Sequence, residues 1–144
     1  MAKRITVCAG IDTGKLKLDV AIDGRGEQLQ VENTAEGHQA LLEWLRRHKV
    51  KRIGIEASGG YELPVVAELR RNRFVVVVFQ PAQVRAYAKF HLQLAKNDKI
   101  DAALVAACTA AVQAAISAAS ILSFLASCKS VSYTHLTLPT NREV

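Results

Sequence analysis

The sequence contains few cysteines, and the three that it has form no recognisable site. Cys8, Cys108 and Cys128 are an odd set, lack C-x-x-C spacing and have no histidine at a ligand spacing. Because disulfide frameworks use even sets of cysteines and structural zinc sites use paired ones, we expect neither in this chain. We interpret the three side chains as small apolar residues in a reducing cytosol.

Secretion signals and nucleotide-binding loops are also lacking. The first residues, MAKRI, lead directly into a strand pattern without the apolar run and cleavage site of a signal peptide, so we expect a cytoplasmic (bacterial) protein. Gly10 and Gly14 are separated by three residues rather than four, and Lys15 is not followed by serine or threonine, which excludes a P-loop. At 144 residues the chain is one-domain size and too short for a two-lobed nucleotide enzyme.

Residues 102–128 contain no charged side chain, and alanine occurs there in pairs every four residues. Because alanine is the best helix former and small side chains allow close helix packing, we predict a long Ala-rich helix. A transmembrane span is the alternative. Alanine is only weakly apolar and polar residues interrupt the segment, so we expect no membrane partner. These polar residues are Thr109, Gln113, Ser117, Ser120, Ser123 and Ser127.

Positive charge exceeds negative charge over the whole chain. Lysine and arginine number 19 against 13 aspartates and glutamates, a formal net charge of +6. A basic chain whose acids gather in motifs suits a polyanionic partner that lysines and arginines hold while carboxylates hold metal. The alternative is that the charge only keeps the protein soluble.

The hydrophobic pattern before residue 102 predicts an α/β domain. Alternation predicts three strands within residues 4–32, and the turn at 23–26 predicts a hairpin between 16–22 and 28–32. A helix capped by Thr34, a strand at 50–56, a helix at 61–71, a strand at 74–79 and a helix after Pro81 follow. The run 75–79 does not alternate, which predicts a strand covered on both faces. This order matches a ribonuclease-H-like (RuvC-like) mixed five-stranded sheet with flanking helices.

Four acidic residues could converge on one metal site in such a fold. Asp12 and Glu56 close two apolar strand patterns, and Asp98 and Asp101 are three residues apart at a predicted helix start. Phosphodiester chemistry needs a neutralised phosphate and an activated attacking oxygen, which Mg²⁺ (or Mn²⁺) held by carboxylates supplies. Each aspartate taken alone is more commonly a helix or turn cap.

Several residues near these acids are candidates for nucleic-acid contact. The glycines after Ser58 would let backbone amides approach a phosphate, and Tyr61 could stack or hydrogen-bond; the alternative is a turn capped by Ser58. Most basic clusters are solvated faces, but lysines that flank the acids could track a phosphate backbone. The predicted contacts are Lys15, Ser58, Tyr61, Arg85, Lys96 and Lys99. We interpret His38, His48 and His91 as surface or packing residues.

Four segments together resemble a known family. AGIDTGK at 9–15, IEASGGY at 55–61, FQPAQV at 79–84 and KNDKIDA at 96–102 are similar to the N-terminal domain of the DEDD transposases of the IS110 and Piv type. The resemblance extends over about residues 4–116. It implies that the positions of Asp12, Glu56, Asp98 and Asp101 bind Mg²⁺ in a RuvC-like nuclease fold.

The resemblance also implies DNA transposition or site-specific recombination, guided by a structured RNA of the element, in an enzyme that is a homo-oligomer when intact. In the family, a second, C-terminal domain carries a serine that attacks DNA. No serine of this chain matches it, so we expect the chain not to complete strand transfer alone. The alternatives are a nucleic-acid-binding or oligomerisation fragment without turnover, and an actin-like or sugar-kinase-like ATPase fragment.

We therefore expect three segments. Residues 1–101 form the RuvC-like domain, residues 102–130 form the Ala-rich helical extension, and residues 131–144 form a non-native or disordered tail. That tail resembles the conceptual translation of a sequencing adapter, so its residues are excluded from the site.

Overall fold

The computed structural model describes residues 5–91 and 101–129. The predicted site residues Asp98, Lys96 and Lys99 and the tail 131–144 lie outside these ranges. The strands are β1 (Cys8–Thr13), β2 (Lys17–Ile22), β3 (Gln28–Glu32), β4 (Arg52–Glu56) and β5 (Val75–Phe79). The helices are α1 (Ala35–Arg47), α2 (Leu63–Arg71), α3 (Pro81–Phe90) and α4 (Ala102–Lys129).

The five strands form one mixed sheet in the order β3-β2-β1-β4-β5. β1, β2 and β3 are an antiparallel meander, whereas β4 runs parallel to both β1 and β5. Helical segments connect the parallel strands, as a parallel pair requires. The predicted α/β class and the five-stranded mixed sheet with flanking helices are confirmed.

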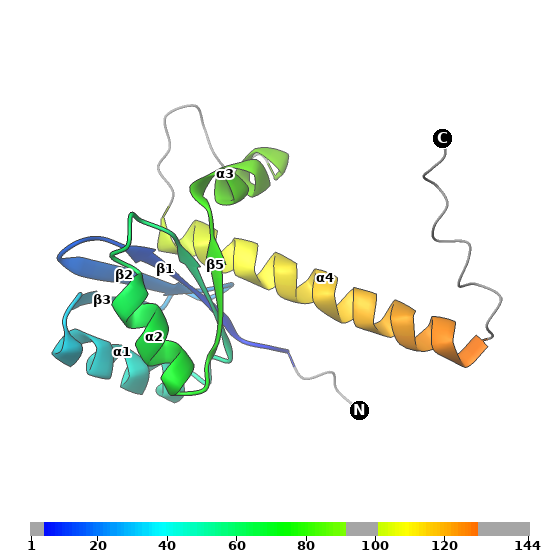
Figure 1. The fold of residues 1–144 in the computed structure, drawn as a ribbon, viewed down its shortest axis with the longest axis horizontal. Helices are drawn as coiled ribbons and strands as arrows, with labels where there is room; N and C mark the ends of the chain where they lie inside the picture. Colours follow the sequence, from blue (N-terminus) through cyan, green and yellow to red (C-terminus); the bar gives the residue numbers. More distant parts are fainter. Residues whose placement is uncertain (1–4, 92–100, 130–144) are drawn as a thin grey trace. The chain divides into compact units, whose positions relative to one another are not determined.

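Helices α1 and α2 cover one face of this sheet (Figure 1). Ile11, Val20 and Ile55 point from the central strands into a core that Leu45 of α1 and Leu69 of α2 complete, and all five are at most 1% exposed. Strand side chains alternate between faces, so the other face carries the intervening residues, among them Gly10, Asp12 and Gly54.

Helix α1 begins where its sequence predicts. The Thr34 hydroxyl accepts a hydrogen bond from the backbone N–H of Gly37 at 3.1 Å, which satisfies one of the donors left unpaired at a helix start. α2 differs from the prediction, since it begins at Leu63 rather than at residue 61. Tyr61 and Glu62 lie in the turn before α2, and Glu62 is the N-cap residue of the helix.

The first turns of α4 pack on the face opposite to α1 and α2. Gly10 and Gly54 are register partners in β1 and β4, and a Cβ added to Gly10 would collide with the backbone of Ala102 and Ala106. The Thr109 hydroxyl, fully buried near Gly54, donates to the Val105 carbonyl at 2.6 Å. Glycines at these two positions therefore let the helix backbone lie directly on the sheet.

The first compact unit of the chain accordingly extends to Ala111, so it includes the beginning of α4. A second unit comprises Val112–Val144, of which the structure describes the continuation of α4 to Lys129. One stretch, Ala102–Ala119, is long and apolar enough to cross a membrane, with a mean hydropathy of 1.8. Residues 102–109 are largely buried in the first unit, which is the packing of a core helix.

The last strand is covered less completely than the sequence predicts. β5 stands at the end of the strand order, Val75 is 48% exposed, Val76, Val77 and Val78 are half-buried, and only Phe79 is buried. Within the described residues β5 pairs with β4 alone, so its outer edge is open. A continuous apolar run cannot distinguish such an edge strand from a central one.

Candidate metal and nucleic-acid site

The register of β1 and β4 brings two of the predicted carboxylates to one face of the sheet. Gly10 pairs with Gly54, and Asp12 and Glu56 each follow two residues later, so both side chains leave the same face at the carboxyl ends of parallel strands. Both residues are partly buried. This end of the sheet lies beyond the turns of α4 that cover the glycines.

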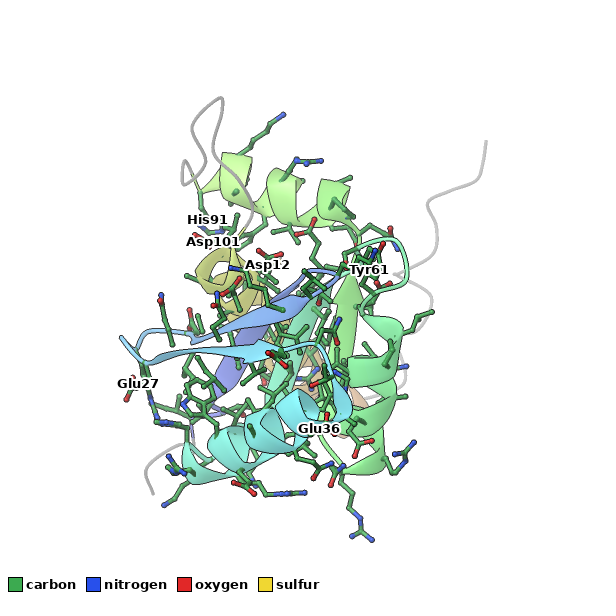
Figure 2. All side chains as sticks on the ribbon, turned by 90° about the vertical axis from the view of Figure 1, so that its left-hand side faces the viewer. Asp12, Glu27, Glu36, Tyr61, His91 and Asp101 are labelled. Atoms are coloured by element: carbon green, nitrogen blue, oxygen red, sulfur yellow. The ribbon has the colours of Figure 1, made fainter. Side chains whose placement is uncertain are left out.

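Asp101 reaches the same place from the start of α4. Its Oδ1 accepts a hydrogen bond from the Leu104 N–H at 2.8 Å, and its carbonyl accepts from the Val105 N–H at 3.0 Å, so Asp101 is the N-terminal cap of the helix. The cap uses one carboxylate oxygen and leaves Oδ2 for another ligand. Figure 2 shows Asp12 and Asp101 next to each other, and both line a cavity of about 470 Å³.

The electrostatics place Asp12 at the centre of this cluster. Burial raises the pKa of Asp12, and the negative charges of Asp19 and Asp101 raise it further. Burial also raises the pKa of Glu56, as does the charge of Asp12, while the nearby guanidinium of Arg85 opposes the shift. Carboxylates from three other elements thus interact with Asp12 in pairs, and a cation next to Asp12 would relieve this repulsion.

Asp19 is a residue of this cluster that the sequence analysis missed. It stands directly opposite Asp12 in the β1–β2 register, lines the same cavity and accepts a hydrogen bond from Gln30 Nε2 at 2.6 Å. The predicted hairpin already contained Asp19, but only the strand register shows that it faces Asp12. A change of one residue in that register would move it to the other face of the sheet.

The described residues supply hard oxygen donors but not a complete metal site. Within residues 5–91 and 101–129, no three His, Cys, Asp or Glu side chains are close enough together to hold a metal ion. Asp98, the remaining predicted ligand, lies outside these ranges. Carboxylate oxygens from Asp12, Glu56 and Asp101 fit the ligand preference of Mg²⁺ or Mn²⁺.

The loop after Glu56 binds the carboxylate of Glu62. Glu62 is 7% exposed, and its Oε2 accepts hydrogen bonds from the N–H groups of Ser58 and Gly60, both at 3.0 Å, and from the Ser58 hydroxyl at 3.4 Å. Burial alone would raise the pKa of Glu62, but these hydrogen bonds lower it below its ordinary value. Gly59 and Gly60 have φ of 71° and 104°, which glycine adopts without strain.

Glu62 therefore changes two interpretations of this loop. Ser58 does not cap α2, since Glu62 is the N-cap residue and its carboxylate binds back into the loop. The amides of Ser58 and Gly60, which the sequence suggested for a phosphate, already bind an internal carboxylate. The Tyr61 ring remains accessible, since this residue is 46% exposed.

The predicted basic contacts lie on neighbouring elements. Lys15 is exposed in the β1–β2 turn, and Arg85 is exposed on α3, close enough to Glu56 for its charge to act on that carboxylate. The N–H of Gly14 in the same turn donates to the Lys17 carbonyl at 2.9 Å.

This arrangement agrees with the comparison to known families. The family model for DEDD transposases of the IS110 type, with the description Transposase, matches residues 9–121. The chain belongs to this transposase family. No curated protein matches the sequence. The residues that match the family model include β1, β4, α3 and most of α4. The resemblance drawn from the four motifs is therefore confirmed.

Membership in a transposase family identifies the described fold as a transposase N-terminal domain and implies DNA as its substrate. The ATPase alternative finds no support in this match.

Proposed function

We propose that this chain is the metal-dependent catalytic domain of an insertion-sequence transposase and acts in DNA strand cleavage and transfer in the bacterial cytoplasm. Asp12, Glu56, Asp98 and Asp101 are the proposed ligands of Mg²⁺ or Mn²⁺. The observation that supports this proposal best is the position of Asp12, which lies on the same face and at the same end of the sheet as Glu56 and lines one cavity with Asp101.

In this proposal the metal ion and the side chains that hold it have different roles. A bound divalent ion supplies charge neutralisation of a phosphodiester and activation of an attacking oxygen. Asp12 and Glu56 are held by the rigid ends of β1 and β4, so they define the site with little reorganisation. Asp101 is fixed through Oδ1 by the α4 backbone, which directs Oδ2 as the remaining donor.

The basic residues around the carboxylates orient the DNA. Arg85 lies near Glu56, where a guanidinium can hold a phosphate oxygen next to the carboxylates. Lys15 and Tyr61 extend this surface, and Lys96 and Lys99 are proposed as further contacts. In the proposed complete reaction, a serine of a second domain attacks the DNA, a structured RNA of the element guides it, and the enzyme is a homo-oligomer.

Thermal unfolding with and without divalent metal tests the proposed ligands. At a metal concentration of about 100 times Kd, we expect stabilisation by roughly 2.7 kcal/mol, seen as a rise in Tm with Mg²⁺ or Mn²⁺. The Asp12→Asn and Asp98→Asn variants should lose this rise. Without metal, Asp12→Asn should melt no lower than the parent chain, because the substitution removes a like charge opposite Asp19.

Glu27→Gln is the matched control. Glu27 is an exposed carboxylate at the hairpin end, away from Asp12 in Figure 2, so the variant should retain the full response to metal. An equal loss in Glu27→Gln, or an unchanged response in Asp12→Asn, would contradict the proposed site. Metal and DNA binding without strand cleavage would instead favour the fragment that binds nucleic acid without turnover.

A further inference from the structure

Asn33 joins two loops that lie far apart in the sequence. It stands between the end of β3 and the N-cap of α1, and its Nδ2 donates to the carbonyl of Gly14 at 3.0 Å and to the carbonyl of Tyr61 at 3.1 Å. The first acceptor belongs to the β1–β2 turn and the second to the loop between β4 and α2. Within the described parts of the chain, no other hydrogen bond joins these two loops.

The orientation of this amide is fixed by its partners. Both hydrogens of Nδ2 are used by carbonyls, so Oδ1 must be the acceptor of the 2.8 Å contact with His38 Nε2. His38 therefore carries a proton on Nε2 and donates it. A flipped Asn33 amide would point its oxygen at two carbonyl oxygens, which excludes that orientation.

His38 is buried, and its ring can donate from Nε2 to Asn33. The residue is 7% exposed on α1, and burial lowers the pKa of its ring, with the charge of Glu68 opposing the shift. The Nε2–H donor is present in either protonation state, given the tautomer that Asn33 selects. His38 thus acts on the two loops through Asn33 and has no direct bond to either of them.

Each of the two loops also has hydrogen bonds of its own. Gly14 N–H donates to the Lys17 carbonyl at 2.9 Å, and Glu62 binds the amides of Ser58 and Gly60. Loss of the Asn33 amide therefore leaves both loops formed but removes the side-chain bonds that connect them, while the Asn33 N–H still donates to the Leu16 carbonyl at 2.9 Å. Each of the connected loops carries an exposed residue, Lys15 on one loop and Tyr61 on the other.

We propose that Asn33, oriented by His38, is a positioning residue that holds Lys15 and Tyr61 as one preorganised DNA-contact surface beside the carboxylates. This inference rests on the proposed function, because it takes both residues to contact DNA. Preorganisation raises affinity by reducing the ordering that binding would otherwise require. Lys15 and Tyr61 then act cooperatively only while Asn33 connects their loops.

A double-mutant cycle on DNA binding tests the proposal. The probe is a fluorescein-labelled DNA duplex, and the variants are Lys15→Ala, Tyr61→Ala and their combination, each in the parent chain and in Asn33→Asp. Asn33→Asp keeps the shape of the side chain but replaces the donor with a carboxylate that two carbonyls repel. We expect the two substitutions to be non-additive by about two- to tenfold in the parent and additive in Asn33→Asp.

Two further variants separate positioning from stability. His38→Gln retains a donor near Nε2 and should preserve the coupling, whereas His38→Leu should abolish it. Val50→Ala truncates a core residue that is 3% exposed, and it should lower Tm without changing the coupling. In Asn33→Asp, the rise of Tm with Mg²⁺ should persist, since the metal ligands are unchanged.

The outcomes distinguish this inference from the proposed function. Coupling that survives in Asn33→Asp, or disappears equally in Val50→Ala, overturns the positioning role while the DNA-binding function stands. A parent chain that does not bind the duplex at all overturns both.

Discussion

Two carboxylates near the site are positioned by hydrogen bonds from the backbone. Asp101 caps α4 through Oδ1, and Glu62 accepts two amides and a hydroxyl from the loop that follows Glu56. In both cases the main chain orients the side chain, so its direction does not depend on a bound ligand. The cap uses Oδ1 of Asp101 alone, so it is compatible with the proposed role of Asp101 as a metal ligand, because a carboxylate has two oxygens.

Glu62 leads to a prediction about acid stability. Because hydrogen bonds lower its pKa from the ordinary value of 4.5, the stabilisation is present above that pH and is lost as pH falls through the lowered pKa. Glu62→Gln should reduce the free energy of unfolding at neutral pH by about 1–3 kcal/mol. Urea unfolding from pH 3 to pH 7 measures both effects.

The variant should also show a weaker decline of stability on the acid side than the parent chain. Glu36→Gln is the control, since Glu36 is exposed in the first turn of α1. Parallel pH profiles for Glu62→Gln and the parent would show that the buried carboxylate does not hold the loop.

At the scale of elements, the site depends on how α4 approaches the sheet. Because Gly10 and Gly54 have no side chains, α4 can contact β1 and β4 directly. This contact between helix and sheet places Asp101 beside Asp12. The alanine pattern correctly predicted a helix, but it favoured another helix as the packing partner. It could not show that the partner of the first turns is a sheet, because small residues permit close approach to any surface.

Gly10→Ala tests this contact. The added Cβ would meet backbone atoms of α4, which cannot rotate away, so we expect a loss of about 3 kcal/mol or more in the free energy of unfolding. The response to divalent metal should weaken as well, since Asp101 would move with the helix. Chemical denaturation and metal-dependent Tm measure these two effects.

Gly26→Ala provides the comparison for that substitution. A Cβ on Gly26 would meet nothing within 4 Å, so its effect should stay within about 0.5 kcal/mol. If Gly10→Ala were as mild as Gly26→Ala, the helix would not rest on the sheet as described.

At the scale of the whole molecule, a basic chain surrounds a cluster of acids. The formal charge of +6 favours DNA, whereas Asp12, Asp19 and Asp101 line one cavity and would repel a phosphate without the proposed cation. The proposed contact Lys15 is exposed in the turn that follows the strand of Asp12, and the proposed contact Arg85 is exposed on α3 near Glu56. Affinity for DNA should therefore depend on both salt and divalent metal.

Salt dependence tests the basic residues. Each phosphate contact contributes a slope of about −0.9 to a plot of log K against log salt concentration, so Lys15→Ala and Arg85→Ala should each reduce the slope by about one. Fluorescence anisotropy with a DNA duplex measures it. Arg25→Ala, in the exposed hairpin turn, is the control and should leave the slope unchanged. A similar reduction in all three variants would indicate only a general effect of net charge.

The sequence by itself determined the kind and order of the elements. Alternation, the Thr34 cap and the turn residues are local signals, and they led to the correct mixed sheet and helix α1. The positions of Asp12 and Glu56 at strand ends followed from the same signals. The four motifs led to the family, because residue identities at fixed spacings are themselves properties of the sequence.

Only the tertiary structure decided which side chains meet. Asp19 faces Asp12 because of the β1–β2 register, Glu62 occupies the loop amides, and Asn33 connects two loops that lie on either side of it in the sequence. The position of β5 at the end of the described sheet is likewise a result of the strand order. Such contacts depend on register and on long-range packing, which hydrophobic periodicity does not encode.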